Sequence, residues 1–96
     1  MTSSGAVWTV EYAASAARAI RRLDPQIRRR VKAAIETLAR DPGRGKPLQL
    51  SLAGLRSLRT GDYRIIYKTE AGKLLILVVA VGHRREVYAR LRDRLR

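Results

Sequence analysis

A chain of 96 residues has room for one domain, and its hydrophobic content of 46% is enough for one core, which excludes wholesale disorder. The 21 Lys and Arg residues outnumber the 8 Asp and Glu residues and give a formal net charge of +13. Such a chain repels copies of itself and favours a polyanionic partner. Most of the cations are arginine, whose planar guanidinium binds phosphate through paired hydrogen bonds. The composition therefore favours nucleic acid.

Residue types that are absent or rare exclude several kinds of chemistry. Without cysteine, the chain has no disulfide scaffold, thiol catalyst or Cys-ligated metal, and a single histidine, His83, excludes a multi-histidine site. We therefore expect neither a metal nor a cofactor. No signal peptide is visible, and the longest apolar run, Leu74–Val81, is far shorter than the ~20 residues that span a bilayer. We expect a cytoplasmic protein with no membrane partner.

The first half of the chain predicts one strand and two helices. Apolar and polar residues alternate over Trp8–Tyr12, which is the period of a strand. The period becomes helical over residues 16–23, with Ser15 as the expected N-cap. Asp24 and Pro25 predict the start of a second helix, because Asp caps helices and the first turn does not need the N–H that Pro lacks. Its apolar stripe consists of Ile27, Val31, Ile35 and Leu38.

The second half predicts three strands and a final helix after a connecting segment, residues 43–54. Leucines alternate with polar residues in this segment, which suggests that part of it lies flat on the core. Two strands are expected over Leu55–Arg59 and Tyr63–Thr69. The third, Leu74–Val81, is apolar on both faces, which is typical of a central strand that is covered on both sides. Helical spacing of apolar residues predicts a C-terminal helix over residues 86–96.

The element order β-α-α-β-β-β-α predicts a single α+β domain over residues 1–96. A helical hairpin should pack on a mostly antiparallel four-stranded sheet. Residues 1–5 are expected to form a disordered leader.

Basic residues should gather at one end of this sheet. Strand alternation puts Arg64 and Lys68 on one face, and the preceding strand can bring Arg59 close to Arg64. The last strand delivers a second polar cluster, residues 83–85, with Tyr88 following within one turn. Several arginines with one His and one Tyr, and without a carboxylate pair, are typical of a phosphate site.

Each of these residues also has a structural interpretation. His83 can act as a general acid or base, but a lone histidine at a strand end is more often a surface or hydrogen-bonding residue. Arg64 is either a phosphate clamp or a paired structural arginine. Tyr88 either stacks on a base or closes the core.

The chemistry that remains is metal-free cleavage of RNA, in which the substrate supplies its own nucleophile, the 2′-hydroxyl. No phosphate-binding loop is present, since Gly43–Lys46 lacks the required spacing. The protein would align the 2′-hydroxyl with the adjacent phosphorus, neutralise the developing charge with arginine, and move protons with His or Tyr.

Two segments, Gly54–Tyr67 and Val78–Tyr88, resemble the RelE/ParE superfamily of toxins from bacterial type II toxin–antitoxin pairs. The most specific parts are Gly-Asp-Tyr-Arg at residues 61–64 and Gly-His-Arg-Arg-Glu-Val-Tyr at residues 82–88. The element order, length and basic charge agree, and the resemblance covers nearly the whole chain. RelE-like members are ribosome-dependent mRNA endonucleases that cleave A-site codons by 2′-hydroxyl attack and halt translation, whereas ParE-like members poison DNA gyrase.

The resemblance implies roles for individual residues. Arg64 matches the strand arginine that contacts the scissile phosphate, and Arg84 matches the second catalytic arginine. Tyr88 matches the tyrosine that stacks on a base or assists proton transfer, and His83 falls where the best-known member has Lys. ParE-like members generally lack this His/Lys-Arg…Tyr constellation, so the resemblance favours the RelE-like branch.

The sequence departs from the family's pattern on the second strand, where a pair of lysines is replaced by Leu55 and Ser57. Neither residue pairs with phosphate as Lys does, so His83 becomes the expected base. Charge near the site is expected from Arg56, Arg59, Lys68 and Arg85. Contacts with the ribosome are expected from Arg28, Arg29 and Lys32, although charge runs on helices are usually solvated faces.

The resemblance also implies partners: the ribosomal A site with its mRNA, and a cognate acidic antitoxin, RelB-like or other, through which the complex could bind operator DNA. Two alternatives stay open. The chain could be a ParE-like gyrase poison, or a non-catalytic basic RNA-binding protein.

Overall fold

The computed structural model describes residues 7–83 and 85–95, and the side chains of all of these except 93–95. The predicted leader and the last residue of the predicted C-terminal helix lie outside the described residues. The elements in chain order are β1 (Thr9–Tyr12), α1 (Ala14–Arg21), α2 (Pro25–Arg40), β2 (Lys46–Pro47), η1 (Leu50–Leu52), β3 (Arg56–Thr60), β4 (Tyr63–Glu70), η2 (Ala71–Lys73), β5 (Leu75–His83) and α3 (Glu86–Leu95).

The sheet confirms the predicted α+β architecture and adds one short strand to it. Its five strands follow the order β1-β5-β4-β3-β2, with β1 parallel to β5 and the other pairs antiparallel. The addition is β2, which pairs Lys46 with Ser57 and Pro47 with Arg56. Four strands were predicted because two residues are too few for an alternating pattern.

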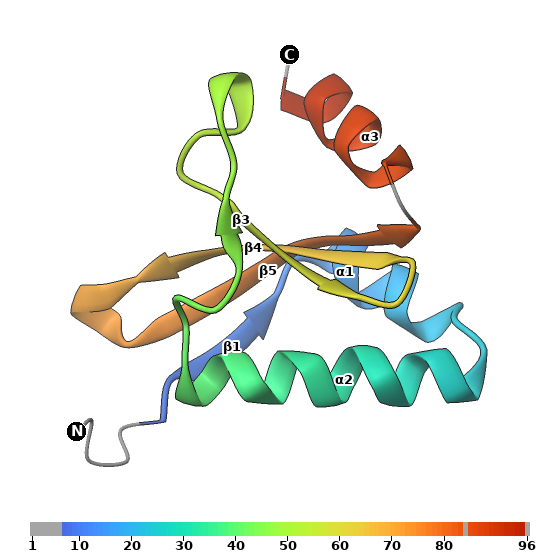
Figure 1. The fold of residues 1–96 in the computed structure, drawn as a ribbon, viewed down its shortest axis with the longest axis horizontal. Coiled ribbons are helices and arrows are strands. Elements are labelled where there is room, and N and C mark those ends of the chain that lie inside the picture. The colour runs from blue at the N-terminus through green and yellow to red at the C-terminus, as the bar shows by residue number, and fades with distance from the viewer. Residues whose placement is uncertain (1–6, 84, 96) are drawn as a thin grey trace.

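Helices cover both faces of the sheet, α1 and α2 on one face and α3 on the other (Figure 1). The core under α1 and α2 contains Ala16, Ile20, Val31, Ile35, Leu38, Ile65, Tyr67, Ile76, Val78 and Val81. The smaller core under α3 contains Leu52, Ile66, Ala80, Val87 and Leu91. Within the described residues, no helix combines the length and the apolar character needed to cross a membrane.

A bulge in the central pair of strands sets which side chains share a face. Ile66 pairs with Ala80, but the next residue, Tyr67, pairs with Val78. Val79 is therefore an extra residue on β5, and the alternation is restored beyond it. As a result, Val78 and Val81, three residues apart on β5, both face α1 and α2, whereas Ala80 faces α3.

Two local predictions were wrong. Ser15 is not the N-cap, because α1 begins at Ala14 with Ala13 at the N-cap position. The Ala13 N–H donates to the Val78 carbonyl, so the helix starts directly where the pairing of β1 with β5 ends. The segment after β2 does not lie flat, since Leu50 has φ 58° and is 93% exposed. By contrast, α2 does begin at Pro25, with Asp24 at the N-cap position.

Candidate nucleic-acid interface

Two arginines form the floor of the site. Arg59 on β3 and Arg64 on β4 are directly opposite each other in the antiparallel register, as expected from the sequence. Arg59 Nε donates to the Gly61 carbonyl at 3.3 Å. Among the residues that the structure describes, no ion pair within 4.0 Å neutralises either guanidinium. The sheet therefore holds two uncompensated positive charges side by side.

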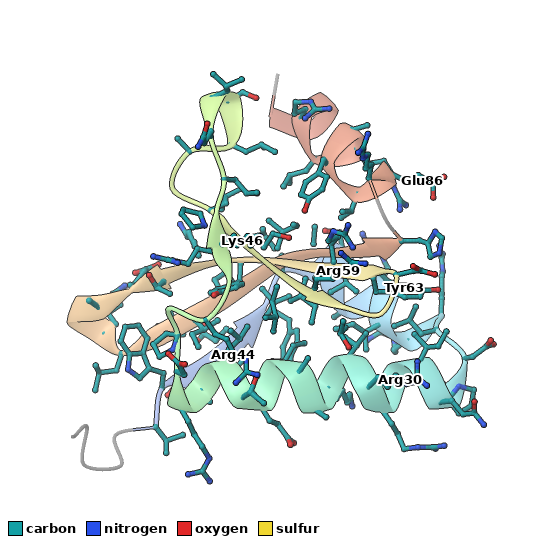
Figure 2. All side chains as sticks on the ribbon, in the orientation of Figure 1. Arg30, Arg44, Lys46, Arg59, Tyr63 and Glu86 are labelled. Atoms are coloured by element: carbon teal, nitrogen blue, oxygen red, sulfur yellow. The ribbon has the colours of Figure 1, made fainter. Side chains whose placement is uncertain are left out.

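The floor is enclosed on one side by the segment after α2 and on the other by α3. A hollow of about 460 Å³ has Arg44, Lys46, Arg59, Arg64 and Tyr88 among its lining residues. Figure 2 shows Lys46 on the β2 side of Arg59 and Glu86 on the α3 side. We call this hollow the basic cleft.

Tyr88 reaches into the basic cleft from α3. Its hydroxyl lies 2.8 Å from the Ser57 Oγ, and either atom could be the donor. Its ring packs half-buried against the core under α3, together with Leu48 and Leu55. Ser57 thus fixes the phenol at the wall of the basic cleft, next to the arginine floor.

The open end of the basic cleft carries mixed charge. A second hollow of about 460 Å³ shares Arg59 and Arg64 with the first and adds Arg85, Asp62 and Glu86. Arg85 was predicted to bind phosphate, and it lies at this rim. The two carboxylates at the same end restrict the strongly positive part of the surface to the interior of the cleft.

The wall that carries Arg44 and Lys46 is held by a buried tyrosine. Tyr67 Oη donates to the Pro42 carbonyl at 2.9 Å and accepts the Gly45 N–H at 2.9 Å. A Cβ at Gly45 would lie 2.7 Å from that hydroxyl oxygen, so this close approach requires glycine. Burial raises the pKa of Tyr67 and Asp41 adds to the effect, against the Gly45 hydrogen bond and the Arg56 charge, which lower it.

Arg56, which is predicted to bind phosphate, lies in this wall. Its Nη1 donates to the Gly45 carbonyl at 2.7 Å and to the Gly43 carbonyl at 3.3 Å. Ser57, Leu58 and Arg59 of β3 line the basic cleft, and Arg56 does not. The guanidinium thus stabilises the backbone of the segment between α2 and β2.

His83 lies on the opposite face from the arginine floor. It pairs with Tyr63, and the two rings meet edge to face at 5.2 Å. Its Nε2 is 4.0 Å from Asp62 Oδ2, and its surroundings include Ile27 and Arg30 of α2. Arg64 pairs instead with Gly82, so alternation sends the histidine toward α2. His83 therefore does not lie together with Arg64 and Tyr88, which corrects the expectation from the sequence.

The remaining predicted residues are dispersed. Lys68 lies farther along β4 and does not line the basic cleft. Arg29 and Lys32 are exposed on α2, across the sheet from that cleft. Arg28 is half-buried, and its Nη2 donates to the Leu23 carbonyl at 3.1 Å, which gives it a structural contact. Arg84 lies outside the described residues.

Two basic residues of the cleft were missed. Arg44 and Lys46 lie in the glycine-containing segment that lacks the spacing of a phosphate-binding loop. A signal was available, because two cations alternate there with glycines just before Pro47. Their position depends on β2, which the sequence pattern did not predict.

Comparison with known proteins shows the family to which the chain belongs. The family model described as the ParE toxin of the type II toxin–antitoxin system parDE matches residues 7–88. Toxin RelG of Mycobacterium tuberculosis is 36% identical over 85 residues, covering 86% of this chain and 98% of that protein. Toxin RelE of the same organism is 36% identical over 81 residues, covering 82% of this chain and 84% of that protein.

A solved structure agrees with these relatives. The RelBE2 toxin–antitoxin complex from Mycobacterium tuberculosis superposes with a TM-score of 0.77 at 35% sequence identity, covering 81% of this chain and 92% of that chain. Because the family model spans most of the sequence and the relatives match over most of their own length, the chain belongs to the RelE/ParE superfamily of type II toxin–antitoxin toxins.

Proposed function

We propose that this toxin is a ribosome-dependent mRNA endonuclease that cleaves the codon in the A site. The observation that carries the proposal is the opposed pair Arg59 and Arg64 on the floor of the basic cleft, beside the Ser57–Tyr88 hydrogen bond. An uncompensated pair of guanidinium groups is suited to a phosphate that gains charge in the transition state.

The reaction needs no cofactor to balance. The 2′-oxygen of one nucleotide bonds to the adjacent phosphorus, the bond from phosphorus to the 5′-oxygen breaks, and the products are a 2′,3′-cyclic phosphate and a 5′-hydroxyl. The 2′-hydroxyl gives its proton to water, the 5′-oxygen gains one from a side-chain donor, and that donor regains its proton from water. The arginine floor stabilises the pentacovalent phosphorane, and the Tyr88 hydroxyl supplies the proton to the leaving 5′-oxygen. Arg84 keeps the role of second catalytic arginine that the family resemblance implies.

A ribosome requirement follows from what this cleft lacks. Among the described residues, those that line its interior include no histidine or carboxylate, and Asp62 and Glu86 lie at its rim. The alignment of the RNA must therefore supply much of the rate. Fixing the nucleophile and phosphorus in line is worth up to ~7–11 kcal/mol, more than a single side chain gives. The ribosome would provide that alignment.

The proposed partner that restrains the activity is an acidic antitoxin. Solved relatives include toxin–antitoxin complexes, and a surface with a net charge of +13 is most simply neutralised by an acidic segment. The complex could bind operator DNA through the antitoxin.

The test is single-turnover cleavage of mRNA on programmed ribosomes, with the 5′ ends of the products mapped. Cuts should fall in phase with codons, and ribosome-free mRNA should be cut far more slowly. Arg64→Ala should lower the rate by about 10²–10³, the usual loss for one preorganised donor. Arg29→Ala, an exposed cation across the sheet, is the matched control and should cleave like the wild type at saturating protein.

Three outcomes would contradict the proposal. Equal cleavage with and without ribosomes would remove the ribosome requirement. A folded Arg64→Ala protein with wild-type rate would remove the arginine floor from the chemistry. Growth arrest with DNA damage signalling and intact mRNA would instead identify a ParE-like gyrase poison.

A further inference from the structure

A second cavity gathers arginines from two helices. It has a volume of about 200 Å³ and lies between α1, β5 and α3. Arg18 and Arg22 line it from α1 and Arg90 lines it from α3, all three with exposed side chains. Among the described residues that line it, none is acidic. We call it the three-arginine cavity.

This cavity adjoins the arginine floor of the basic cleft. Gly82 on β5 is the register partner of Arg64 on β4. A Cβ at Gly82 would lie 3.1 Å from Arg90 Nη2 and 2.8 Å from the Val87 Cβ, so Arg90 lies directly over the glycine backbone. Neighbouring strands are ~4.8 Å apart, and one step across the sheet therefore leads from Arg64 to Arg90. Arg59, Arg64 and Arg90 therefore follow one another across the sheet toward the three-arginine cavity.

A purely structural explanation accounts for only part of this arrangement. Arg18 is in the last turn of α1 and Arg22 is its C-cap, where positive charge is stabilised by the helix dipole. Arg90 comes from the middle of α3 and gains nothing from that dipole. Bringing a third guanidinium to the other two adds repulsion, which an anion in the cavity would relieve.

We propose that the three-arginine cavity binds the phosphate backbone of the RNA that flanks the cleaved codon, as a second subsite of the basic cleft. This inference rests on the proposed function. Single-stranded RNA fits better than an acidic peptide, because the larger apolar side chains of the lining, Val81, Val87 and Leu91, are only 6%, 3% and 5% exposed. A peptide would find little apolar surface there, whereas a phosphate needs only the guanidinium groups.

The test compares two double variants of the full chain, each lacking two exposed cations. Arg18→Gln/Arg22→Gln alters the three-arginine cavity. Arg21→Gln/Arg29→Gln is the matched control, since Arg21 is on the same helix but does not line the cavity. Gln preserves helix propensity. Binding is measured by fluorescence anisotropy over a range of salt concentrations, with fully 2′-O-methylated oligoribonucleotides that cannot be cleaved. One is short enough to fill the basic cleft alone, and one extends beyond it on both sides.

For the long oligonucleotide, we expect the cavity variant to lower the slope of log K against log salt by about 0.7 for each phosphate that it no longer neutralises, with a smaller change in the control. The short oligonucleotide should bind both variants alike. Equal slopes for the two variants on the long RNA would overturn the subsite while leaving cleavage at the basic cleft intact. So would a loss of binding by the cavity variant that is as large on the short RNA as on the long RNA. Failure of the wild type to bind the long RNA would also overturn the subsite, whereas failure to cut mRNA on ribosomes would refute the proposed function. Unchanged RNA binding with weakened antitoxin binding would assign the cavity to an acidic protein segment and also overturn the subsite.

Discussion

Arg59 and Arg64 are held opposite each other by the register of two strands, where like charges repel and destabilise the sheet. Their pairing could be predicted from the sequence, since alternation and a short turn at residues 60–62 place the two arginines on one face. In a site for phosphate, this repulsion is relieved when the anion binds. The same backbone that sets the distance between the two arginines thus prepares them for a substrate oxygen.

The residue that moves the proton is expected to be Tyr88 and not His83. Tyr88→Phe keeps the ring that packs under α3 but removes the hydroxyl 2.8 Å from Ser57. It should lower single-turnover cleavage on programmed ribosomes within the ~10²–10⁴ range of a general acid. His83→Ala should stay close to the wild-type rate, because its side chain lies on the α2 face against Tyr63. A slow His83→Ala protein beside an active Tyr88→Phe protein would reverse this assignment.

At the scale of the elements, the segment that carries Arg44 and Lys46 depends on Tyr67 for its position. Tyr67→Phe would leave the Gly45 N–H and the Pro42 carbonyl without their partner, at a cost of about 1–3 kcal/mol of unfolding free energy. Tyr63→Phe is a matched control, since that hydroxyl makes no hydrogen bond to any residue that the structure describes. Chemical denaturation measures both, and equal stability of the two variants would contradict the role of Tyr67.

The burial of Tyr67 also predicts the direction in which stability changes at alkaline pH. Burial raises the pKa of Tyr67 above its ordinary value of 10.0. The folded state therefore holds this proton more tightly than the unfolded chain does, so the contribution is complete below pH 10.0 and is lost as pH rises through the raised value. As pH rises above 10.0, the unfolding free energy should fall less steeply in Tyr67→Phe than in Tyr63→Phe. Parallel curves would mean that Tyr67 does not titrate differently on folding.

The elements could be predicted from the sequence where local patterns determine them. Pro25 after Asp24 set the start of α2, and apolar content on both faces identified β5 as a covered strand. The placement of His83 depended on pairing with Tyr63, which only the register supplies. The extra residue Val79 is apolar like its neighbours, so the bulge could not be predicted from the sequence. The two-residue strand β2 was invisible for a similar reason, because its pairing is determined by contacts distant in the sequence.

For the whole molecule, the dominant property is the excess of positive charge. A net charge of +13 on 96 residues works against the compact state, because the cations repel one another in the fold. Among the described residues, Lys73 and Glu70 form the one ion pair within 4.0 Å between Lys or Arg and a carboxylate, and His83 Nε2 lies 4.0 Å from Asp62. Folding thus neutralises few of the positive charges locally, and their mutual repulsion must be reduced by salt or by an anionic partner.

Salt and an anionic partner both reduce this repulsion, so the stability of the free toxin and its affinity for the partner should depend on salt in opposite directions. Added salt screens repulsion within the free toxin over a Debye length of ~10 Å at 0.1 M, so its unfolding free energy should rise with salt. The same screening weakens attraction to an acidic antitoxin, so the affinity of that complex should fall with salt. Denaturant unfolding of the toxin and titration with the antitoxin, both over one salt series, measure the two trends. Arg29→Gln/Lys32→Gln removes two exposed cations and should flatten the stability trend. If the free toxin were insensitive to salt, self-repulsion would not be what its partner relieves.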